Sequence, residues 1–191
     1  MICLKRVFTS MIKTTYHEVS NELFDRFKQI KLIISDVDGV LSDGKIYMTE
    51  HGDEIKSFNA KDGCGIVSVI KQGIEFAVIT GRSSTLLAKR MADLKVKYVY
   101  QAVTDKVEKY REMIQQLGLV PEETLYIGDD VIDLPLLGSV GISVAVADAH
   151  PLLLGQVDLV TKNIGGSGAV REITDIVLQA QGKLSIIEGS I

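Results

Sequence analysis

Short apolar runs and helical patterns alternate along most of the chain. The apolar runs are typical of buried strands and are centred near Leu32, Ala77, Tyr98, Tyr126, Val144 and Leu159. Apolar positions at helical spacing predict helices over residues 63–72, 84–94, 105–117, 131–137, 150–154 and 169–181. Strands that alternate with helices in this way predict an α/β fold with a doubly wound, Rossmann-like parallel sheet.

One segment breaks this alternation. Two strand-like stretches flank Gly52 and predict a β-hairpin flap over residues 44–58. The chain between Asp38 and Thr80 then has room only for this hairpin and one helix, and the chain between Thr80 and Lys106 only for a helix and a strand. Because a folded domain usually needs at least about 50 residues, we expect no cap domain.

The two ends of the chain lie outside the predicted domain, which we place at residues 31–182. We expect residues 1–30 to form a flexible leader as far as Thr15 and then a short helix, and residues 183–191 to form a tail. Lys13 interrupts the first apolar run too early for a signal peptide, and no run approaches the roughly 20 apolar residues that cross a membrane. A cytoplasmic protein without a membrane partner is therefore expected.

Composition and charge narrow the functional class. Hydrophobic residues make up 46% of the chain, which suits a sheet covered by helices on both faces. The net charge of −4 argues against a nucleic-acid partner. The two cysteines, Cys3 and Cys64, form neither a metal-binding spacing nor a disulfide framework, as is usual in a reducing cytosol. A small soluble enzyme fits these features.

Asp36-Val37-Asp38 is the first candidate for chemistry. It follows the apolar run at Leu32, and alternation along a strand lets Asp36 and Asp38 point the same way at the carboxyl end, where open α/β sheets place their active sites. Two such carboxylates repel each other, and a cation relieves the repulsion. One carboxylate could then attack a substrate while the other moves a proton. Taken alone, the pair could also be a hydrated turn.

Further polar residues follow later strands. Thr80-Gly81-Arg82 comes directly after one apolar run, Gly128-Asp129-Asp130 comes after another, and Lys106 begins a predicted helix. In a parallel sheet these groups should converge on one rim with the first pair of aspartates. Oxygen ligands at a phosphate site suit Mg²⁺.

Each of these residues also has a plainer interpretation. Asp129 and Asp130 could simply start a helix, where negative charge is favourable. Thr80 could cap the helix after it, although Ser83 is an equally good cap, and Lys106 could be a solvated surface lysine. Their joint occurrence with the earlier Asp-x-Asp pair favours a metal and phosphate site.

The ordered set Asp36-x-Asp38, Thr80, Lys106 and Gly128-Asp129-Asp130-x-x-Asp133 resembles the haloacid dehalogenase-like phosphatases. The resemblance is closer to one branch, the 3-deoxy-D-manno-octulosonate 8-phosphate phosphatases. It is carried by residues 36–44, 79–82, 126–133, 143–154, 168–172 and 179–184, and it covers roughly residues 30–191.

The resemblance implies a role for each acidic residue. Asp36 would attack phosphorus and form an aspartyl phosphate, while Asp38 would protonate the leaving sugar oxygen and later take a proton from water. Mg²⁺ would be held by Asp36, the main-chain carbonyl of Asp38 and Asp129. Asp130 and Asp133 would orient the metal shell or the lysine.

It also implies the groups that hold the substrate. Thr80 and Lys106 would hold phosphoryl oxygens. From the residues themselves, Arg82 could pair with a nearby carboxylate or reach a substrate carboxylate, and we favour the substrate. Gly81, beside it, and Lys61 are further candidates for contact with the substrate. The position of Ser167 is usually basic in this branch, so the exact substrate depends on whether another charge, such as that of Lys61, replaces it.

The implied activity is Mg²⁺-dependent hydrolysis of 3-deoxy-D-manno-octulosonate 8-phosphate to 3-deoxy-D-manno-octulosonate and phosphate, in lipopolysaccharide precursor synthesis. The resemblance also implies a homotetramer in which hairpins pack together and a neighbour covers each site. Two alternatives remain at this point. One is a phosphatase for another sugar acid phosphate, such as a nonulosonate 9-phosphate. The other is a receiver-like phospho-acceptor domain, although receivers lack the acid/base that Asp38 provides.

Overall fold

A computed structural model describes residues 10–184 of the chain. Its centre is a six-stranded sheet in the order β10-β9-β8-β3-β6-β7, in which every neighbouring pair is parallel. The strands are β3 (Leu32–Ser35), β6 (Glu75–Ile79), β7 (Tyr98–Tyr100), β8 (Thr124–Gly128), β9 (Ile142–Ala145) and β10 (Leu159–Val160). The predicted doubly wound α/β fold is confirmed.

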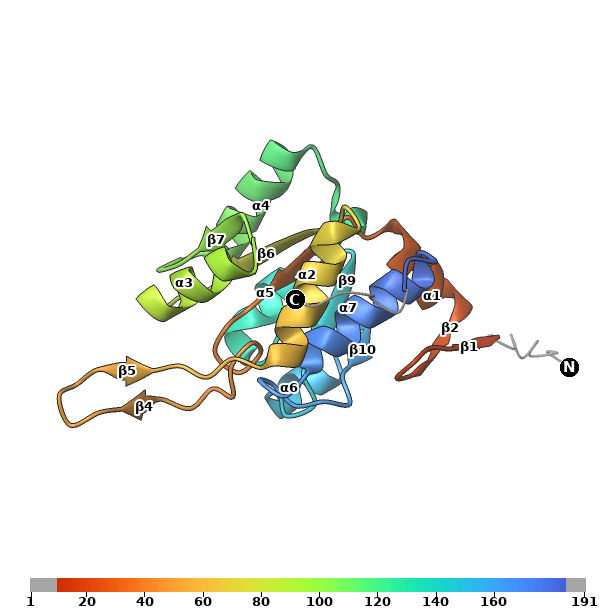
Figure 1. Cartoon of the computed structure of the whole chain (residues 1–191). Coiled ribbons are helices and arrows are strands. Elements are labelled where there is room, and N and C mark those ends of the chain that lie inside the picture. The colour runs from red at the N-terminus through yellow and green to blue at the C-terminus, as the bar shows by residue number, and fades with distance from the viewer. Residues whose placement is uncertain (1–9, 185–191) are drawn as a thin grey trace, which may run out of the picture.

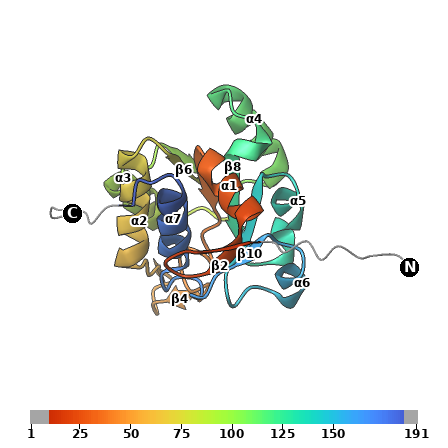
Figure 2. The ribbon, with the colours of Figure 1, turned by 90° about the vertical axis from the view of Figure 1, so that its right-hand side faces the viewer.

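Helices cover both faces of this sheet (Figure 2). One layer holds α2 (Ala60–Lys71), α3 (Thr85–Asp93) and α7 (Ala169–Ala180), and the other holds α4 (Lys106–Leu117), α5 (Leu134–Leu137) and α6 (Pro151–Leu154). The strands are therefore buried on both sides, and Leu32, Ile33 and Ile34 of β3 have no exposed surface. Two short 3-10 helices, η1 (Pro121–Glu123) and η2 (Val131–Asp133), complete this part.

The helix predicted over residues 131–137 is divided in the structure. Residues 131–133 form η2, and α5 begins only at Leu134, with Pro135 in its first turn. Proline lacks the N–H that would continue the hydrogen bonds of η2, so it suits the beginning of a helix. The division leaves Asp133 at the junction, fully buried.

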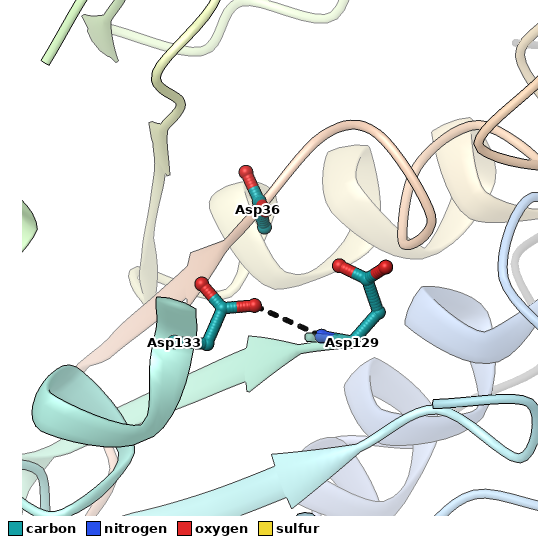
Figure 3. A group of neighbouring side chains, drawn as sticks. All are labelled: Asp36, Asp129 and Asp133. Carbon is teal, nitrogen blue, oxygen red and sulfur yellow. Dashed lines mark hydrogen bonds between the residues drawn. The ribbon is translucent and has the colours of Figure 1, made fainter. Parts of the chain in front are cut away.

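The sheet order explains where the polar residues gather. The chain passes from β3 to β6 on one side and returns to β8 on the other, so the order of the strands reverses at the carboxyl end of β3. Ligands bind at such switch points in open α/β sheets. Asp36 follows β3 and Asp129 follows β8 at this point (Figure 3).

The predicted hairpin flap is present. Strands β4 (Tyr47–Met48) and β5 (Glu54–Ile55) pair antiparallel and project away from the sheet (Figure 1). Gly52, at a φ of +84°, lies at the turn. Only this hairpin and α2 separate β3 from β6, and only α3 and β7 separate β6 from α4, so the described chain has no cap domain inserted at either position.

The expected flexible leader is wrong from Ser10 onward. Strand β1 (Met11–Lys13) pairs with β2 (Glu18–Ser20), and α1 (Asn21–Gln29) follows and packs against α7. The side chain of Ser20 caps α1 by accepting a hydrogen bond from the N–H of Leu23 at 3.1 Å. The remaining leader, residues 1–9, and most of the predicted tail, residues 185–191, lie outside the described residues.

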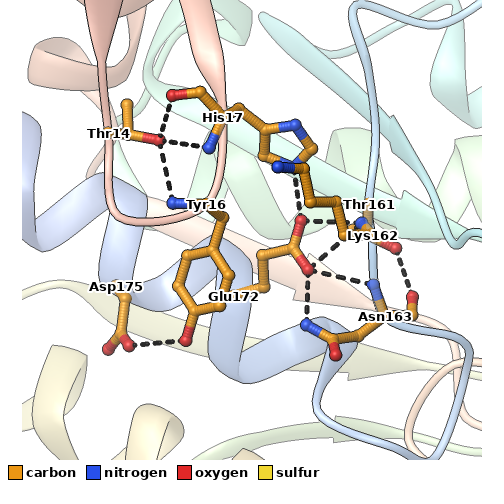
Figure 4. Close-up of polar contacts among 8 residues, drawn as sticks. All are labelled: Thr14, Tyr16, His17, Thr161, Lys162, Asn163, Glu172 and Asp175. Carbon is orange, nitrogen blue, oxygen red and sulfur yellow. Dashed lines mark hydrogen bonds and ion pairs between the residues drawn. The ribbon is translucent and has the colours of Figure 1, made fainter.

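Side chains of the N-terminal hairpin bind α7, which explains why the segment is ordered (Figure 4). The hydroxyl of Tyr16 donates to Asp175 at 3.1 Å, and His17 Nε2 lies 2.5 Å from Glu172 Oε1. The His17 side chain is 13% exposed. These contacts join positions more than 150 residues apart, and no local pattern predicts them.

Glu172 also fixes the loop that supports the site. It is fully buried and accepts hydrogen bonds from the N–H groups of Lys162 and Asn163 at 2.9 and 3.1 Å (Figure 4). Two glycines then follow in the chain. A Cβ on Gly165 would lie 1.7 Å from the carbonyl oxygen of Gly39, so the two backbones touch behind the acidic residues.

None of the helices within residues 10–184 is both long and apolar enough to cross a bilayer.

The Glu172 contacts predict a loss of stability in a nearly isosteric variant. Glu172→Gln turns an acceptor of several N–H groups into a partial donor, which should lower the free energy of unfolding by about 2–3 kcal/mol. Urea unfolding measures the change. The exposed Glu22→Gln in α1 is the matched control and should differ from wild type by less than about 0.5 kcal/mol. Equal stability of the two variants would contradict this role of Glu172.

Candidate active site

Three carboxylates meet at the carboxyl ends of β3 and β8 (Figure 3). One oxygen from each of Asp36, Asp129 and Asp133 lies within 4.8 Å of the others. Asp36 is 6% exposed and Asp133 is fully buried. Water therefore does little to screen the repulsion among these groups.

Burial and the neighbouring carboxylates raise the pKa of two of these groups. Burial raises the pKa of Asp36 to about 6; Lys106 lowers it in part, and Asp133 raises it further. Burial, together with the carboxylates of Asp36, Asp133 and Asp130, raises the pKa of Asp129 to about 7. The lysine therefore does not compensate all the negative charge, and the site favours a cation.

Lys106 is held rigidly beside this cluster. Its ammonium lies 3.0 Å from Asp36 Oδ2 and 2.7 Å from Asp133 Oδ1, and its side chain is 9% exposed. Burial lowers the pKa of Lys106, but the two carboxylates raise it by more, so the ammonium form is favoured. Asp105 caps α4 directly before it, accepting from two N–H groups at 2.9 Å. The interpretation of Lys106 as a solvated surface lysine is wrong.

Asp133 supports its neighbours. Oδ1 accepts from Lys106 and, at 2.6 Å, from the hydroxyl of Tyr126. Oδ2 accepts from the N–H groups of Asp129 at 3.0 Å and Asp130 at 3.3 Å. With both oxygens engaged, Asp133 orients Lys106 and the backbone after β8. Asp130 has a different contact: its Oδ1 accepts from the N–H of Val131 at 2.7 Å and caps η2.

The remaining oxygen atoms fit a hard divalent cation. Asp36 and Asp129 present carboxylate oxygens from adjacent strand ends, and oxygen-only ligands suit Mg²⁺. The loop after Asp38 approaches closely because residue 39 is glycine. Gly39 has a φ of +89°, and a Cβ there would lie 2.0 Å from Asp129 Oδ2.

Thr80 follows β6 and is 3% exposed. Its Oγ1 accepts from the N–H of Arg82 at 3.3 Å. The cap of α3 is Ser84, which accepts from the N–H of Leu87 at 3.4 Å, so both the expectation of Ser83 as the cap and the alternative of Thr80 are wrong. The Thr80 hydroxyl therefore does not cap this helix.

Asp38 lies on the loop after β3, and its side chain contacts different residues from those that surround Asp36, Asp129 and Asp133. Its Oδ1 contacts the ammonium of Lys56 and lies 3.5 Å from the hydroxyl of Ser42. Its Oδ2 is buried and has no hydrogen-bond partner within the described part of the chain. Lys56 comes from the foot of the hairpin and is 4% exposed.

The predicted substrate-contacting residues lie around this rim without forming one cluster. Arg82 pairs with Glu54 of the hairpin at 3.0 Å and is 43% exposed. Gly81 lines an open cavity of about 490 Å³ together with Lys106. Lys61 is exposed in the first turn of α2, and the N–H of Ser167 donates to Ile164 at 3.2 Å within the glycine-rich turn.

Sequence reasoning missed two residues of this site. Tyr126 lies inside β8, and an aromatic residue in an apolar run is usually interpreted as part of the hydrophobic core. Only its hydroxyl group could have suggested a buried hydrogen-bond partner. Lys56 follows strand β5 of a hairpin that projects away from the sheet, where a lysine is expected to be solvated. Nothing local distinguishes it from the exposed Lys45 of the same hairpin.

Arranged in this way, the site can carry out chemistry on a dianion. Asp36 is a buried carboxylate beside a fixed ammonium, and Asp38 is a second carboxyl group two residues away. Such a set suits attack on phosphorus combined with proton transfer.

Comparison with known proteins places the chain. A profile of the haloacid dehalogenase-like hydrolases matches residues 98–173. The 3-deoxy-D-manno-octulosonate 8-phosphate phosphatase of Escherichia coli K12 is 47% identical over 178 residues, covering 93% of this chain and 95% of that protein.

Solved structures agree with the sequence comparison. The crystal structure of 3-deoxy-D-manno-octulosonate 8-phosphate phosphatase from Yersinia pestis has a TM-score of 0.90 and 48% identity, covering 92% of this chain and 95% of that one. The Moraxella catarrhalis phosphatase, in complex with magnesium, phosphate and a KDO molecule, has a TM-score of 0.83 and 36% identity, covering 85% and 93%. The chain therefore belongs to the haloacid dehalogenase-like hydrolases and, within them, to the 3-deoxy-D-manno-octulosonate 8-phosphate phosphatase family.

Proposed function

We propose that this protein is a Mg²⁺-dependent phosphatase that hydrolyses 3-deoxy-D-manno-octulosonate 8-phosphate to 3-deoxy-D-manno-octulosonate and phosphate, in lipopolysaccharide precursor synthesis. The observation that carries the proposal is the buried Asp36 held 3.0 Å from Lys106 beside Asp129, in a chain 47% identical to the Escherichia coli phosphatase. We place its activity in the cytoplasm, as its composition and cysteine usage suggest.

Charge decides what the site must do. The phosphate monoester and Asp36 are both anionic, and a pair of like unit charges at about 4 Å costs about 4 kcal/mol at an effective dielectric near 20. Lys106 offsets part of this repulsion. Mg²⁺ held by Asp36, Asp129 and the main-chain carbonyl of Asp38 would supply the remaining compensation at the phosphoryl oxygens.

Side chains of this protein carry out both steps, which are the formation and the hydrolysis of an aspartyl phosphate. A carboxylate oxygen of Asp36 attacks phosphorus while Asp38 protonates the departing sugar oxygen. Asp38 next takes a proton from water, whose oxygen attacks phosphorus and releases Asp36. Thr80 and Lys106 hold phosphoryl oxygens in both steps, and Asp133 keeps Lys106 in place. Preorganised charge of this kind is the main source of catalysis in phosphoryl transfer.

We assign recognition of the sugar acid to residues around the edge of the active site. Arg82 would leave Glu54 to meet the substrate carboxylate, next to the backbone of Gly81, and Lys61 would add positive charge. Ser167 lacks the usual basic group, and this favours keeping a nonulosonate 9-phosphate as the second candidate substrate. A receiver-like role is disfavoured because Asp38 supplies the acid/base that turnover needs.

We also propose that the active form is a homotetramer. Ile46, Met48 and Ile55 of the hairpin are 59%, 66% and 55% exposed, and a protrusion of this kind cannot cover its own apolar side chains. Packing hairpins from several copies together would cover them, and a neighbouring copy would then close each site against water.

The proposed chemistry predicts that activity depends on Asp36. With Mg²⁺, wild type should release phosphate from 3-deoxy-D-manno-octulosonate 8-phosphate faster than from a nonulosonate 9-phosphate. Asp36→Asn should reduce kcat/KM by more than about 10³-fold while circular dichroism stays unchanged, since the nucleophile is lost and the shape is kept. The exposed Asp25→Asn in α1 is the control. Near wild-type turnover by Asp36→Asn rules out the mechanism, and a preference for the nonulosonate overturns the substrate.

The tetramer predicts a linked loss of assembly and activity. The double variant Met48→Asp and Ile55→Asp should shift the mass in light scattering to smaller species and weaken turnover, because charged groups in the packed hairpins are costly. Val120→Asp, an equally exposed apolar position away from the hairpin, should change neither. A fully active monomeric wild type at assay concentration is the result that refutes the tetramer.

A further inference from the structure

The side chain of Lys56 is buried, although the residue before it in the hairpin is exposed. It lies one residue beyond β5, where the hairpin returns toward α2. Its side chain is 4% exposed, whereas the preceding Ile55 is 55% exposed. Burying an ammonium group is costly unless a carboxylate is paired with it. Lys56 contacts Asp38 directly and lies 3.9 Å from Glu54 Oε1.

The two oxygens of Asp38 are treated differently. Oδ1 receives the Lys56 ammonium and has the Ser42 hydroxyl at 3.5 Å. Oδ2 is buried and accepts no hydrogen bond from residues 10–184. Anchoring one oxygen fixes the plane of the carboxyl group, whose side chain as a whole is 24% exposed.

The segment that presents Lys56 is itself fixed to the domain. Phe58 packs against the hydrophobic core. Asn59 caps α2 by accepting from the N–H of Lys61 at 2.8 Å, and its side-chain amide donates to the carbonyl of Gly166 at 3.3 Å. Lys56 is thus supplied by the anchored foot of the hairpin, so its position does not depend on the projecting tip.

We propose that Lys56 is a positioning residue for the acid/base of this phosphatase. It anchors the Asp38 carboxyl group in the position from which that group gives a proton to the leaving group and later takes one from water. The inference rests on the proposed function and assigns it one further residue.

The proton movements balance in both steps. When the phosphorus–oxygen bond to the leaving group breaks, its electron pair stays on the leaving oxygen, which takes the proton from the protonated Asp38 carboxyl group as the Asp36–phosphorus bond forms. Water then bonds to phosphorus and returns a proton to the Asp38 carboxylate. The electron pair of the Asp36–phosphorus bond goes back to the Asp36 carboxylate, and inorganic phosphate is released.

The dependence of kcat/KM on the leaving group distinguishes a positioning role of Lys56 from a general structural role. A basic leaving oxygen needs the proton in the transition state, whereas p-nitrophenolate departs with little need of it. The ratio kcat/KM reports steps up to formation of the aspartyl phosphate and excludes the later attack of water. Phenyl phosphate and p-nitrophenyl phosphate also contain no sugar, so contacts to the sugar do not enter their comparison.

The experiment measures kcat/KM of the full chain with Mg²⁺ for the octulosonate phosphate, phenyl phosphate and p-nitrophenyl phosphate. In Lys56→Met it should fall on the order of 10²-fold for the sugar ester and about 10-fold or more for the phenyl ester, but less than about 3-fold for the nitrophenyl ester. Lys56→Arg should restore most of the loss. Lys71→Met, at an exposed lysine ending α2, should change none of the three.

The outcomes distinguish the inference from the function on which it rests. Equal losses on all three esters, or no loss at all, overturn the positioning role while leaving the phosphatase intact. A loss confined to the sugar ester makes Lys56 a sugar contact and also overturns it. If Lys56→Met does not fold, Lys56→Gln carries the same comparison and should show the same selectivity in milder form. A wild type that hydrolyses none of the esters removes the proposed function itself.

Discussion

The site depends on keeping carboxylates of like charge together in a place that water hardly reaches. Asp36, Asp129 and Asp133 share one corner of the sheet, and only the ammonium of Lys106 opposes them among the described side chains they contact there. Burial and mutual repulsion raise the pKa of Asp36 to about 6 and of Asp129 to about 7. In the folded chain, unfavourable repulsion between carboxylates is therefore concentrated where a cation and a phosphoryl group would meet. The rest of the fold keeps these carboxylates together.

The fold maintains it through three connected supports. Parallel pairing of β3 with β8 sets Asp36 beside Asp129. Asp133 bonds to Lys106 and to the backbone after β8, so the ammonium and the acidic turn form one unit. Behind the loop that follows Asp36, Gly165 touches Gly39, and the buried Glu172 fixes the approach to that glycine turn. The second and third supports are close contacts that a larger or differently charged side chain would disturb.

Much of this could be read from the sequence because the signals were local. Apolar runs gave the strands, and polar residues directly after them gave Asp36, Thr80 and Asp129, since the carboxyl ends of parallel strands share one edge. The missed features depend on contacts between distant segments. Lys56 reads as a surface lysine until the hairpin foot brings it to Asp38. Strand β1 is predicted as part of a leader, and the contact that joins the N-terminal hairpin to α7 links His17 to Glu172, 155 positions later. Local spacing also could not choose between Ser83 and Ser84 as the cap of α3.

The central claim, that the acidic corner is built for a cation, is tested most directly by the free energy of unfolding between about pH 5 and about pH 8, with and without Mg²⁺. Burial and the neighbouring carboxylates raise the pKa of Asp36 to about 6 and that of Asp129 to about 7 in the folded state, against a usual value of 3.8. The folded state thus holds more protons than the unfolded chain, and without Mg²⁺ these groups lower stability as the pH rises. Bound Mg²⁺ keeps both groups ionised, so the stabilisation by Mg²⁺ should grow as the pH rises through 7. A stabilisation by Mg²⁺ that is absent, constant or smaller at higher pH would contradict the account.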